Sequence, residues 1–412
     1  MTRSELPLET FYGLGIAPKL LDRLDALGFK HPTPIQHQAI PVASAGDDLI
    51  GIAQTGTGKT LAFSIPMIQQ ISARGKMGLV LLPTRELAVQ VEETLKKIGG
   101  SLGLRTAILI GGVNINPQTK QLKAKPHVVV ATPGRLIDHV EQKHISLDRV
   151  GILVLDEADR MLDMGFAPQL KRILAWVPKD RQTMLFSATI PPEISQIARA
   201  YMKSPLRVEV APSGTAAEHV DQEVFLVSKQ GKIDLLERLL NEYKGTVLIF
   251  SRTKHGAKKI ARAIRTMRHN AAELHSNRSQ SQRQDALNGF SRGKYRVLVA
   301  TDIAARGIDV KGIELVINYD LPDHSEDYVH RIGRTGRAGQ EGKAISFASP
   351  EQKKDILQIE RLIRTTLPIK SASGDVVDRS KDMMLKPSSS GAASQHRPRP
   401  MGGRRRSFRR RG

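Results

Sequence analysis

The stretch AQTGTGKT at residues 53–60 contains the residue types that bind a chain of phosphates. It follows the apolar run DLIGIA and precedes a helical pattern, so we expect a turn between a strand and a helix. Gly56 and Gly58 let backbone N–H groups converge on phosphate oxygens, and the helix N-terminus adds partial positive charge. Lys59 is placed to reach the terminal phosphates and Thr60 to ligate a divalent cation. The stretch therefore predicts a nucleotide site.

Two adjacent carboxylates, Asp156 and Glu157, end the apolar run in VLDEAD. Because the carboxyl ends of parallel strands collect ligands, we expect both side chains to lie beside the phosphate loop. Asp156 is placed to hold Mg²⁺ through water, and Glu157 to orient and deprotonate an attacking water. Alone, two acids after a strand are more often solvated, but with the loop they predict hydrolysis of a nucleoside triphosphate. Ala53, where the generic loop has glycine, is a departure from the motif.

The composition indicates a polyanionic partner. The 412 residues carry a net charge of +22, and the hydrophobic and charged fractions of 40% and 25% are typical of a globular protein. Basicity for solubility or for an anionic membrane surface stays open as an alternative. The absence of cysteine excludes disulfides and thiolate chemistry. The N-terminus lacks a secretory signal and no run approaches the ~18 apolar residues of a membrane span, so we expect a soluble cytoplasmic monomer.

Short apolar runs alternate with helical patterns along the chain. Their continuous apolar character is typical of strands buried on both faces of a parallel sheet. The stretch at 85–98 has the periodicity of an amphipathic helix. This alternation predicts an α/β doubly wound architecture. The expected strands are 48–53, 78–83, 127–132, 151–156 and 183–188 in the first half, and 246–251, 295–302, 315–320 and 343–349 in the second.

The pattern breaks twice, which divides the chain into two α/β domains and a tail. A Pro, Ser and Gly-rich stretch interrupts the alternation near 203–217, and the apolar periodicity stops from about residue 369. The tail holds 12 Lys/Arg against 3 acids and cannot bury enough apolar area to order itself. The expected parts are a first domain at 1–208, a linker at 209–217, a second domain at 218–368 and a disordered basic tail at 369–412.

Together and in this order, the motifs resemble those of the DEAD-box RNA helicases of superfamily 2, over about residues 11–368. The compact build and arginine-rich end are similar to bacterial members, especially the RhlE-like group. The resemblance implies two tandem RecA-like domains, with ATP and Mg²⁺ as cofactors. The matching motifs are Phe11, GF at 28–29, PTPIQ at 32–36, AQTGTGKT, PTRELA at 83–88, Gly111-Gly112, TPGR at 132–135, DEAD at 156–159, SAT at 187–189, LIFSRT at 248–253, Gln280 with Arg283, ATDIAARGID at 300–309 and HRIGRTGR at 330–337.

The resemblance also implies a role for each matching residue. Gln36 would read the adenine edge with its amide, and Phe29 would stack on the ring with Phe11 behind it, although plain core packing is the alternative for Phe29. Asp309 would contact the ribose. The implied ATP-binding set is Phe11, Phe29, Gln36, Thr55, Gly56, Thr57, Gly58, Lys59, Thr60 and Asp309, and Thr60 and Asp156 would hold Mg²⁺, largely through water.

The implied RNA contacts are arginines, hydroxyls and a backbone amide, which suit phosphates and 2′-OH groups rather than base edges. We therefore expect RNA binding that is independent of sequence. The RNA set is Arg85, Gly112, Thr132, Arg135, Thr253, Arg283 and Thr301, and the set that couples hydrolysis to unwinding is Asp159, Ser187, Thr189, His330 and Arg331. His275-Ser276-Asn277 stands where many relatives have His-Gly-Asp, so one acid near the expected RNA path is missing.

The stretch HRIGRTGRAG at 330–339 places arginines on a period of three. Arg334 and Arg337 are expected to reach the terminal phosphate when the two domains close, as arginine fingers. RNA contact alone is the alternative for this pair. The expected catalytic set is therefore Lys59, Asp156, Glu157, Arg334 and Arg337.

These residues predict an RNA-dependent ATPase that separates short RNA duplexes, in ribosome assembly or RNA decay. ATP and single-stranded RNA would both favour closure of the two domains. The resemblance implies that a helix after TPGR, at roughly 136–140, bends one strand. The rival readings are a duplex DNA translocase and an ATP-locked RNA clamp. The tail would anchor RNA through its phosphates or, alternatively, dock onto an acidic protein.

Overall fold

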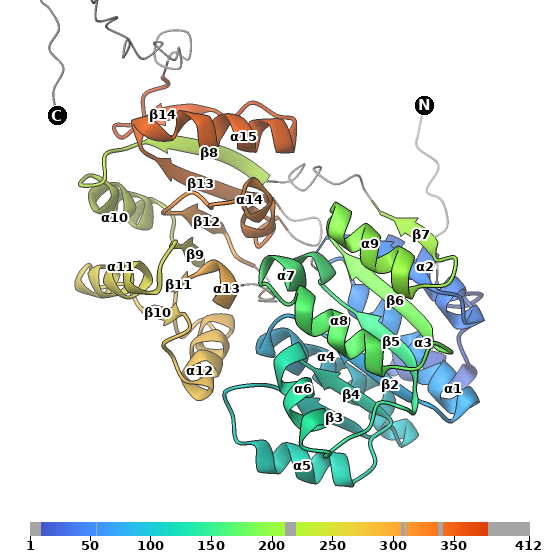
Figure 1. The fold of residues 1–412 in the computed structure, drawn as a ribbon. Helices are drawn as coiled ribbons and strands as arrows, with labels where there is room; N and C mark the ends of the chain where they lie inside the picture. Colours follow the sequence, from blue (N-terminus) through green and yellow to red (C-terminus); the bar gives the residue numbers. More distant parts are fainter. Residues whose placement is uncertain are drawn as a thin grey trace, which may run out of the picture. The chain divides into compact units, whose positions relative to one another are not determined.

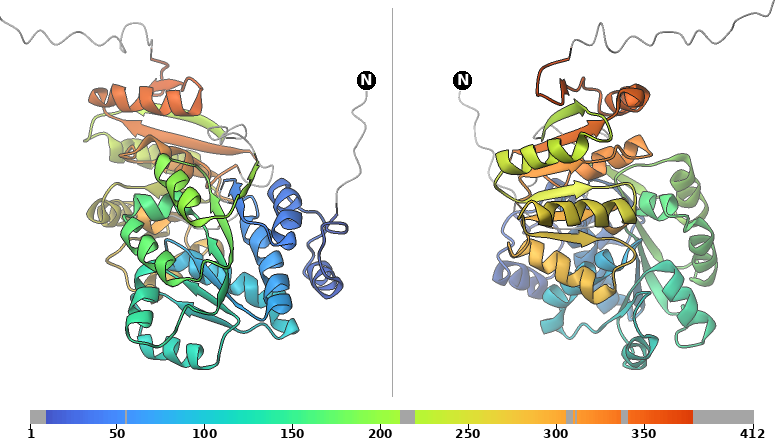
Figure 2. Two further views of the ribbon diagram at one scale, coloured as in Figure 1. Left: turned by 45° about the vertical axis from the view of Figure 1, so that its right-hand side comes forward. Right: turned by 90° about the vertical axis from the view of Figure 1, so that its left-hand side faces the viewer.

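The strands of the protein form two seven-stranded sheets, each parallel throughout. The structure is a computed structural model that describes residues 10–54, 56–210, 220–305, 310, 312–336 and 341–377. Helices lie on both faces of each sheet in every view (Figures 1 and 2). The expected α/β architecture with two tandem domains is therefore confirmed.

The first sheet has the strand order β3-β4-β2-β5-β6-β1-β7. Helices α1 to α4 pack on one face and α5 to α9 on the other (Figure 1). The strands are β1 (Leu49–Ile52), β2 (Met77–Leu81), β3 (Thr106–Leu109), β4 (Val128–Ala131), β5 (Val150–Leu155), β6 (Gln182–Ser187) and β7 (Leu206–Glu209). The helices are α1 (Pro18–Ala26), α2 (Pro34–Ala45), α3 (Lys59–Arg74), α4 (Arg85–Gly99), α5 (Ile115–Lys123), α6 (Pro133–Glu141), α7 (Ala158–Asp163), α8 (Ala167–Trp176) and α9 (Pro192–Tyr201), with a 3₁₀ turn η1 (Gly100–Leu102).

The second sheet repeats this strand order, as β10-β11-β9-β12-β13-β8-β14. Each strand occupies the place of the strand seven positions earlier in the chain, so the two domains share one topology. The strands are β8 (Val220–Leu226), β9 (Val247–Phe250), β10 (Ala271–Leu274), β11 (Val297–Ala300), β12 (Leu315–Asn318), β13 (Gly342–Ala348) and β14 (Ile369–Ser371). The helices are α10 (Lys232–Glu242), α11 (Lys254–Thr266), α12 (Gln280–Ser291), α13 (Asp302–Ala305), α14 (Ser325–Ile332) and α15 (Lys353–Ile363), with a 3₁₀ turn η2 (Pro350–Gln352).

The continuously apolar strands serve two cores at once. In β4, Val128 and Val130 belong to the core under α1 to α4, whereas Val129 and Ala131 belong to the core under α5 to α9. Successive side chains of a strand point to opposite faces, so a strand covered on both sides needs no polar alternation. Each expected strand is present for this reason.

The sequence pattern did not predict five strands, namely the edge strands β3, β7, β10 and β14 and the penultimate strand β8. β14 corrects the boundary expected at 368, because Ile369 pairs in register with Val224 and Lys370 forms an ion pair with Glu223 at 3.0 Å. The second domain thus extends into the stretch expected to be tail. Glu209, expected in the linker, pairs with Ile52 as part of β7. The remainder of the expected linker, from residue 211, and of the expected tail, from 378, lies outside the described residues.

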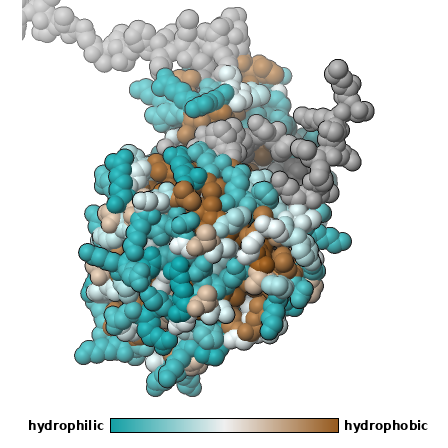
Figure 3. Space-filling model, turned by 90° about the vertical axis from the view of Figure 1, so that its right-hand side faces the viewer, coloured by the Kyte–Doolittle hydropathy of each residue, from teal (hydrophilic) through white to brown (hydrophobic). Residues whose placement is uncertain are grey.

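A space-filling view of one face shows mostly hydrophilic side chains with apolar ones between them (Figure 3). Among the residues that the structure describes, the large apolar side chains exposed to solvent are Tyr12, Phe29, Leu102, Val113, Leu206 and Val376. No helix in the described ranges is long and apolar enough to cross a membrane.

Candidate nucleotide and RNA site

The phosphate loop joins β1 to α3 as the sequence predicts. Gly58 adopts the left-handed conformation (φ 93°) as the residue before α3, and a Cβ there would collide with the Gln36 amide. Thr57 Oγ1 donates to the carbonyl of Gln54 at 2.7 Å, which closes the loop on itself. Lys59 and Thr60 therefore open α3, where backbone N–H groups lack helical partners and can bind an anion. Thr55 lies outside the described residues.

Gln36 holds the phosphate loop to the start of α2. Its Nε2 donates to Gly58 O at 3.0 Å, and its Oε1 accepts from the Thr33 N–H at 2.9 Å in a capping box. Each amide atom has a second bonding direction, so the side chain can hold the loop and still pair with an adenine edge. Phe29 is 37% exposed whereas Phe11 is buried, so simple core packing does not describe Phe29.

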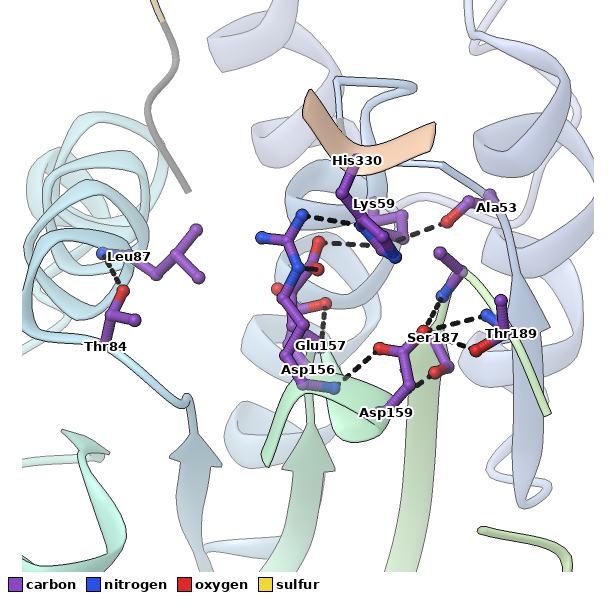
Figure 4. Close-up of polar contacts among 12 residues, drawn as sticks. Ala53, Lys59, Thr84, Leu87, Asp156, Glu157, Asp159, Ser187, Thr189 and His330 are labelled. Atoms are coloured by element: carbon purple, nitrogen blue, oxygen red, sulfur yellow. Dashed lines mark hydrogen bonds and ion pairs between the residues drawn. The ribbon is translucent and has the colours of Figure 1, made fainter. Parts of the chain in front are cut away.

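Lys59 and Glu157 form a buried ion pair at the floor of this site (Figure 4). The Lys59 ammonium donates to Glu157 Oε1 and to Ala53 O, both at 3.0 Å. Arg160 Nε lies 3.0 Å from the other carboxylate oxygen of Glu157. Burial would raise the pKa of Glu157, but Arg160 and Lys59 outweigh it and hold that pKa below its usual range. Glu157 is therefore ionised at neutral pH.

The pKa of the neighbouring acid, Asp156, is shifted in the opposite direction. Burial is the largest influence, and with the charge of Glu157 it raises the pKa of Asp156 to about 7 against the opposing effect of Lys59. Glu157 is the N-cap residue of α7 and adopts the left-handed conformation (φ 53°). The Glu157 N–H donates to Asp156 Oδ1 at 2.9 Å. Two adjacent acids with displaced pKa values can take different roles.

Asp159 ties the DEAD stretch to the SAT stretch at the end of β6. Its Oδ2 accepts from the N–H groups of Ala188 at 3.1 Å and Thr189 at 2.9 Å, and from Thr189 Oγ1 at 2.9 Å. Ser187 Oγ in turn accepts from the Asp159 N–H at 3.1 Å. The structure thus brings together Asp159, Ser187 and Thr189, three residues expected to couple hydrolysis to unwinding (Figure 4).

His330 contacts Arg160, the partner of Glu157, because Arg160 Nη2 lies 2.9 Å from His330 Nδ1. Burial and the Arg160 charge lower the pKa of His330 to about 3, so its ring is neutral and Nδ1 accepts the bond. Arg334, which is 2% exposed, donates from Nε to His330 O at 3.2 Å. Arg337 and Asp309 lie outside the described residues.

Arg331, expected to couple hydrolysis to unwinding, makes its observed bonds within the second domain. Its guanidinium donates to both carboxylate oxygens of Asp302, at 2.5 and 2.7 Å, and to Asn318 Oδ1 and Asp320 O at 3.2 and 2.6 Å. This buried pair fixes α14 against the ends of β11 and β12. Arg331 therefore supports the segment that holds its neighbours His330 and Arg334.

Arg85, Arg135 and Arg283, which are expected to bind RNA, lie close enough for the charges of the other two to act on Arg85. Burial, then Arg283 and more weakly Arg135, lower the pKa of Arg85. Gly112 has φ +72°, and a Cβ there would collide with the Arg85 guanidinium, so glycine is needed for this close approach. Arg283 Nη2 pairs with the buried Glu86 carboxylate at 2.8 Å.

The expected RNA-binding threonines follow the carboxyl ends of β4, β9 and β11. Thr132 donates its N–H to Leu109 O at 2.9 Å just before α6. Thr253 caps α11, where its Oγ1 accepts from the Gly256 N–H at 2.9 Å. Thr301 donates its N–H to Leu274 O at 3.2 Å. All three occupy the sheet edge where ligands of parallel α/β domains bind.

Sequence reasoning missed Arg160 and Glu86. Arg160 follows the DEAD stretch directly and lies three residues from Glu157, a spacing that brings two side chains together on a helix. That spacing was the available signal. Glu86 lies in the first turn of the helix expected at 85–98, where an acid is ordinary, so nothing in the sequence indicated its pairing with Arg283.

The comparisons with known proteins agree with this geometry. The model of the DEAD/DEAH box helicase family matches residues 33–197, and that of the helicase conserved C-terminal domain matches 231–339. The ATP-dependent rRNA helicase RRP3 of Candida albicans is 44% identical over 369 residues, covering 89% of this chain and 69% of the relative. The RRP3 of Debaryomyces hansenii is also 44% identical, with 89% and 77% covered.

Solved structures of two other proteins are also similar to this chain. S. cerevisiae Dbp5 bound to RNA and ADP BeF3 aligns with a TM-score of 0.79 at 30% identity, over 88% of this chain and 96% of that one. Mss116p bound to ssRNA and AMP-PNP aligns with a TM-score of 0.82 at 27% identity, over 90% and 80%.

The two RecA-like domains and the phosphate loop define an ATP-dependent helicase. More narrowly, the chain belongs to the DEAD-box family and is an ATP-dependent RNA helicase, as its motifs indicated.

Proposed function

We propose that this helicase couples each round of ATP hydrolysis to RNA through the chain of contacts Lys59–Glu157–Arg160–His330. The supporting observation is that the general base sits between the phosphate-binding lysine and an arginine that reaches the second domain. A change at His330 can thus alter the surroundings of Glu157 directly. ATP and RNA each favour the arrangement in which these contacts and the arginine fingers are complete.

The catalytic roles follow from the charges. When phosphates occupy the loop, Lys59 turns from Glu157 to the terminal phosphates, which leaves Glu157 a stronger base toward the attacking water. Arg334 and Arg337 neutralise charge on the leaving phosphate. Gln36 and Phe29 hold the adenine, and Asp309 the ribose. The test is a Glu157→Gln variant, which should bind ATP and RNA yet turn over little.

Oxygen ligands at the phosphate loop fit Mg²⁺. The Thr60 hydroxyl and the Asp156 carboxylate supply the hard oxygen donors that Mg²⁺ prefers. Mg²⁺ bound there would neutralise phosphate charge. An Asp156→Asn variant, which loses a charged oxygen donor, should need a higher Mg²⁺ concentration for half-maximal ATPase activity.

RNA binds through phosphates and 2′-OH groups, at Arg85, Gly112, Thr132, Arg135, Thr253, Arg283 and Thr301. These groups do not read base edges, so affinity should vary little with sequence. The resemblance of this chain to the DEAD-box family implies that α6 bends one RNA strand and thereby separates a short duplex. If the protein were instead an ATP-locked clamp, RNA dwell time would lengthen with ATP while strand separation stayed negligible.

The substrate that the relatives support best is ribosomal RNA, because RRP3 is an rRNA helicase. We infer that the protein acts as a monomer in ribosome assembly. A role in RNA decay, a cytoplasmic location and membership of the bacterial RhlE-like group are further proposals that rest on the motifs alone. The RRP3 relatives named above are fungal. The tail would add a salt-sensitive RNA anchor. Sequencing of RNA crosslinked to the protein in cells tests this, and crosslinks without enrichment in ribosomal precursors would reject it.

A further inference from the structure

Gln118 on α5 is a buried amide that uses all its hydrogen-bonding capacity to join two segments of the first domain. Its Oε1 accepts from the Ile110 N–H at 3.2 Å and contacts His139 Nε2 at 3.3 Å. Its Nε2 donates to Ile110 O at 3.0 Å and to Asn114 O at 3.3 Å. Two lone pairs and two N–H groups are the full capacity of an amide. Gln118 therefore links the loop at 110–114 to α6.

The chemistry of the contacts fixes the direction of each bond. Gln118 Oε1 can only accept, so the fully buried His139 carries its proton on Nε2. Burial, then His144 and Arg135, lower the pKa of His139 to about 4, and the neutral ring leaves Nδ1 as an acceptor. His144 Nδ1, 3.1 Å away, must then donate. The result is a relay in which the half-buried His144 donates to the buried His139, and His139 donates to the buried Gln118.

The relay connects two segments that carry expected RNA contacts. The loop at 110–114 contains Gly112, and α6 begins after Thr132 and carries Arg135. On the outer side, Arg135 Nη1 donates to Val113 O at 3.1 Å, so the same two segments are joined a second time. The outer tie is exposed and can be exchanged for a phosphate, whereas Gln118 and His139 of the inner relay are buried.

We propose that Gln118 and His139 are positioning residues for RNA, which hold α6 and the loop at 110–114 at the separation where Gly112, Thr132 and Arg135 contact one strand. This rests on the proposed function, in which α6 bends that strand. When RNA displaces the outer tie, the inner relay keeps α6 in place, so the bending force acts on the RNA rather than on the helix. A buried polar relay favours one arrangement of its partners, because any other leaves polar atoms unpaired.

The test compares His139→Leu with His139→Gln. Leucine removes the donor to Gln118, whereas glutamine can place an N–H near the position of Nε2. We expect His139→Leu to raise the RNA concentration for half-maximal ATPase activity about tenfold, equivalent to ~1.4 kcal/mol, and to lower the duplexes separated per ATP. The KM for ATP should stay unchanged, and His139→Gln should restore most of both RNA-dependent values. A purely structural role would alter the ATP and RNA values together and show no such rescue.

Three further variants make the outcome decisive. Gln118→Met has similar volume and breaks the same relay, so it should behave as His139→Leu does, and it replaces that variant if circular dichroism shows His139→Leu to be unfolded. His127→Leu is a matched control, since His127 accepts from the Arg105 N–H at the opposite end of β4 and should leave RNA values unchanged. Suppose that Arg135→Ala weakens RNA binding but a relay variant keeps the wild-type RNA concentration for half-maximal ATPase activity and the wild-type number of duplexes separated per ATP. That result overturns the inference. Normal values in Arg135→Ala as well overturn the proposed RNA path itself.

Discussion

Arg160 Nη2 lies 2.9 Å from Nδ1 of His330, and the two residues lie on α7 of the first domain and α14 of the second. The same guanidinium pairs with Glu157, the expected general base, at 3.0 Å. Arg160 is 1% exposed, so these contacts form where charge is poorly screened. One arginine therefore lowers the pKa of the expected base and also contacts the second domain.

Replacing Arg160 by leucine should shift the pH dependence of hydrolysis. Arg160 holds the pKa of Glu157 below its usual range against the effect of burial, so its loss raises that pKa. Because hydrolysis needs the ionised carboxylate, the acidic limb of the rate profile should move to higher pH. Single-turnover hydrolysis between about pH 5 and 8 measures this. An unmoved acidic limb would mean that Arg160 does not control Glu157.

Glu157→Gln should lower kcat by about 10²–10⁴-fold, the range that a general base supplies. The amide keeps the size of the side chain and can still accept from Lys59, so ATP and RNA affinities should stay close to those of the wild type. Steady-state hydrolysis and fluorescent-ATP binding give the two values. Normal turnover in this variant would remove Glu157 from the mechanism.

His139 should make the first domain less stable in mild acid. Its pKa of about 4 in the folded chain lies below the ~6.5 of an unfolded chain, so stability is fully present above about pH 6.5 and is lost as pH falls toward 4. His144, Arg135 and Asp138 are the charged or titratable groups that act on it. We expect a loss of up to about 2 kcal/mol between pH 7 and 5.

Urea unfolding of the wild type and of His139→Gln at both pH values isolates this contribution. The variant cannot protonate at position 139, so its unfolding free energy should fall less over the same interval. Parallel losses in the two proteins would show that other groups cause the acid sensitivity.

Arg85→Ala and Arg135→Ala should each weaken RNA binding by a similar factor for all sequences. Each would remove one of the proposed phosphate contacts, so the slope of log K against log salt should become shallower by about 0.7. Arg172→Ala is a suitable control, because Arg172 pairs with Glu141 and stacks on Trp176 at the surface of α8. A loss confined to certain RNA sequences would instead indicate that an arginine reads bases.

Much of the fold and of the nucleotide site could be predicted because their signals are local. Residues that bind phosphate stand together in AQTGTGKT, and strands such as β4 and β5 are apolar along their whole length. The strand β3 was missed because its burial alternates, and β14 because three residues give no period. In the edge strand β7 only Val208 is buried, so its sequence resembles that of a loop.

The missed parts of the site depend on pairs that are distant in the sequence. Glu86 and Arg283 meet across nearly 200 positions, and Gln118 and His139 meet because α5 and α6 pack beside each other. A polar residue on a helix is usually solvated, so its type alone does not predict a buried partner. Conversely, Arg331 was assigned to coupling from its motif, whereas its fourfold bonding within the second domain could be seen only in the structure.

Hydrolysis at the phosphate loop should need Arg334, a buried arginine of the second domain. The decisive measurement compares ATP affinity and RNA-stimulated kcat on one preparation of Arg334→Ala. We expect nearly unchanged ATP affinity and a kcat lower by about 10³-fold or more, as for the loss of an arginine finger. A variant that loses only RNA affinity, with full kcat at saturating RNA, would contradict it.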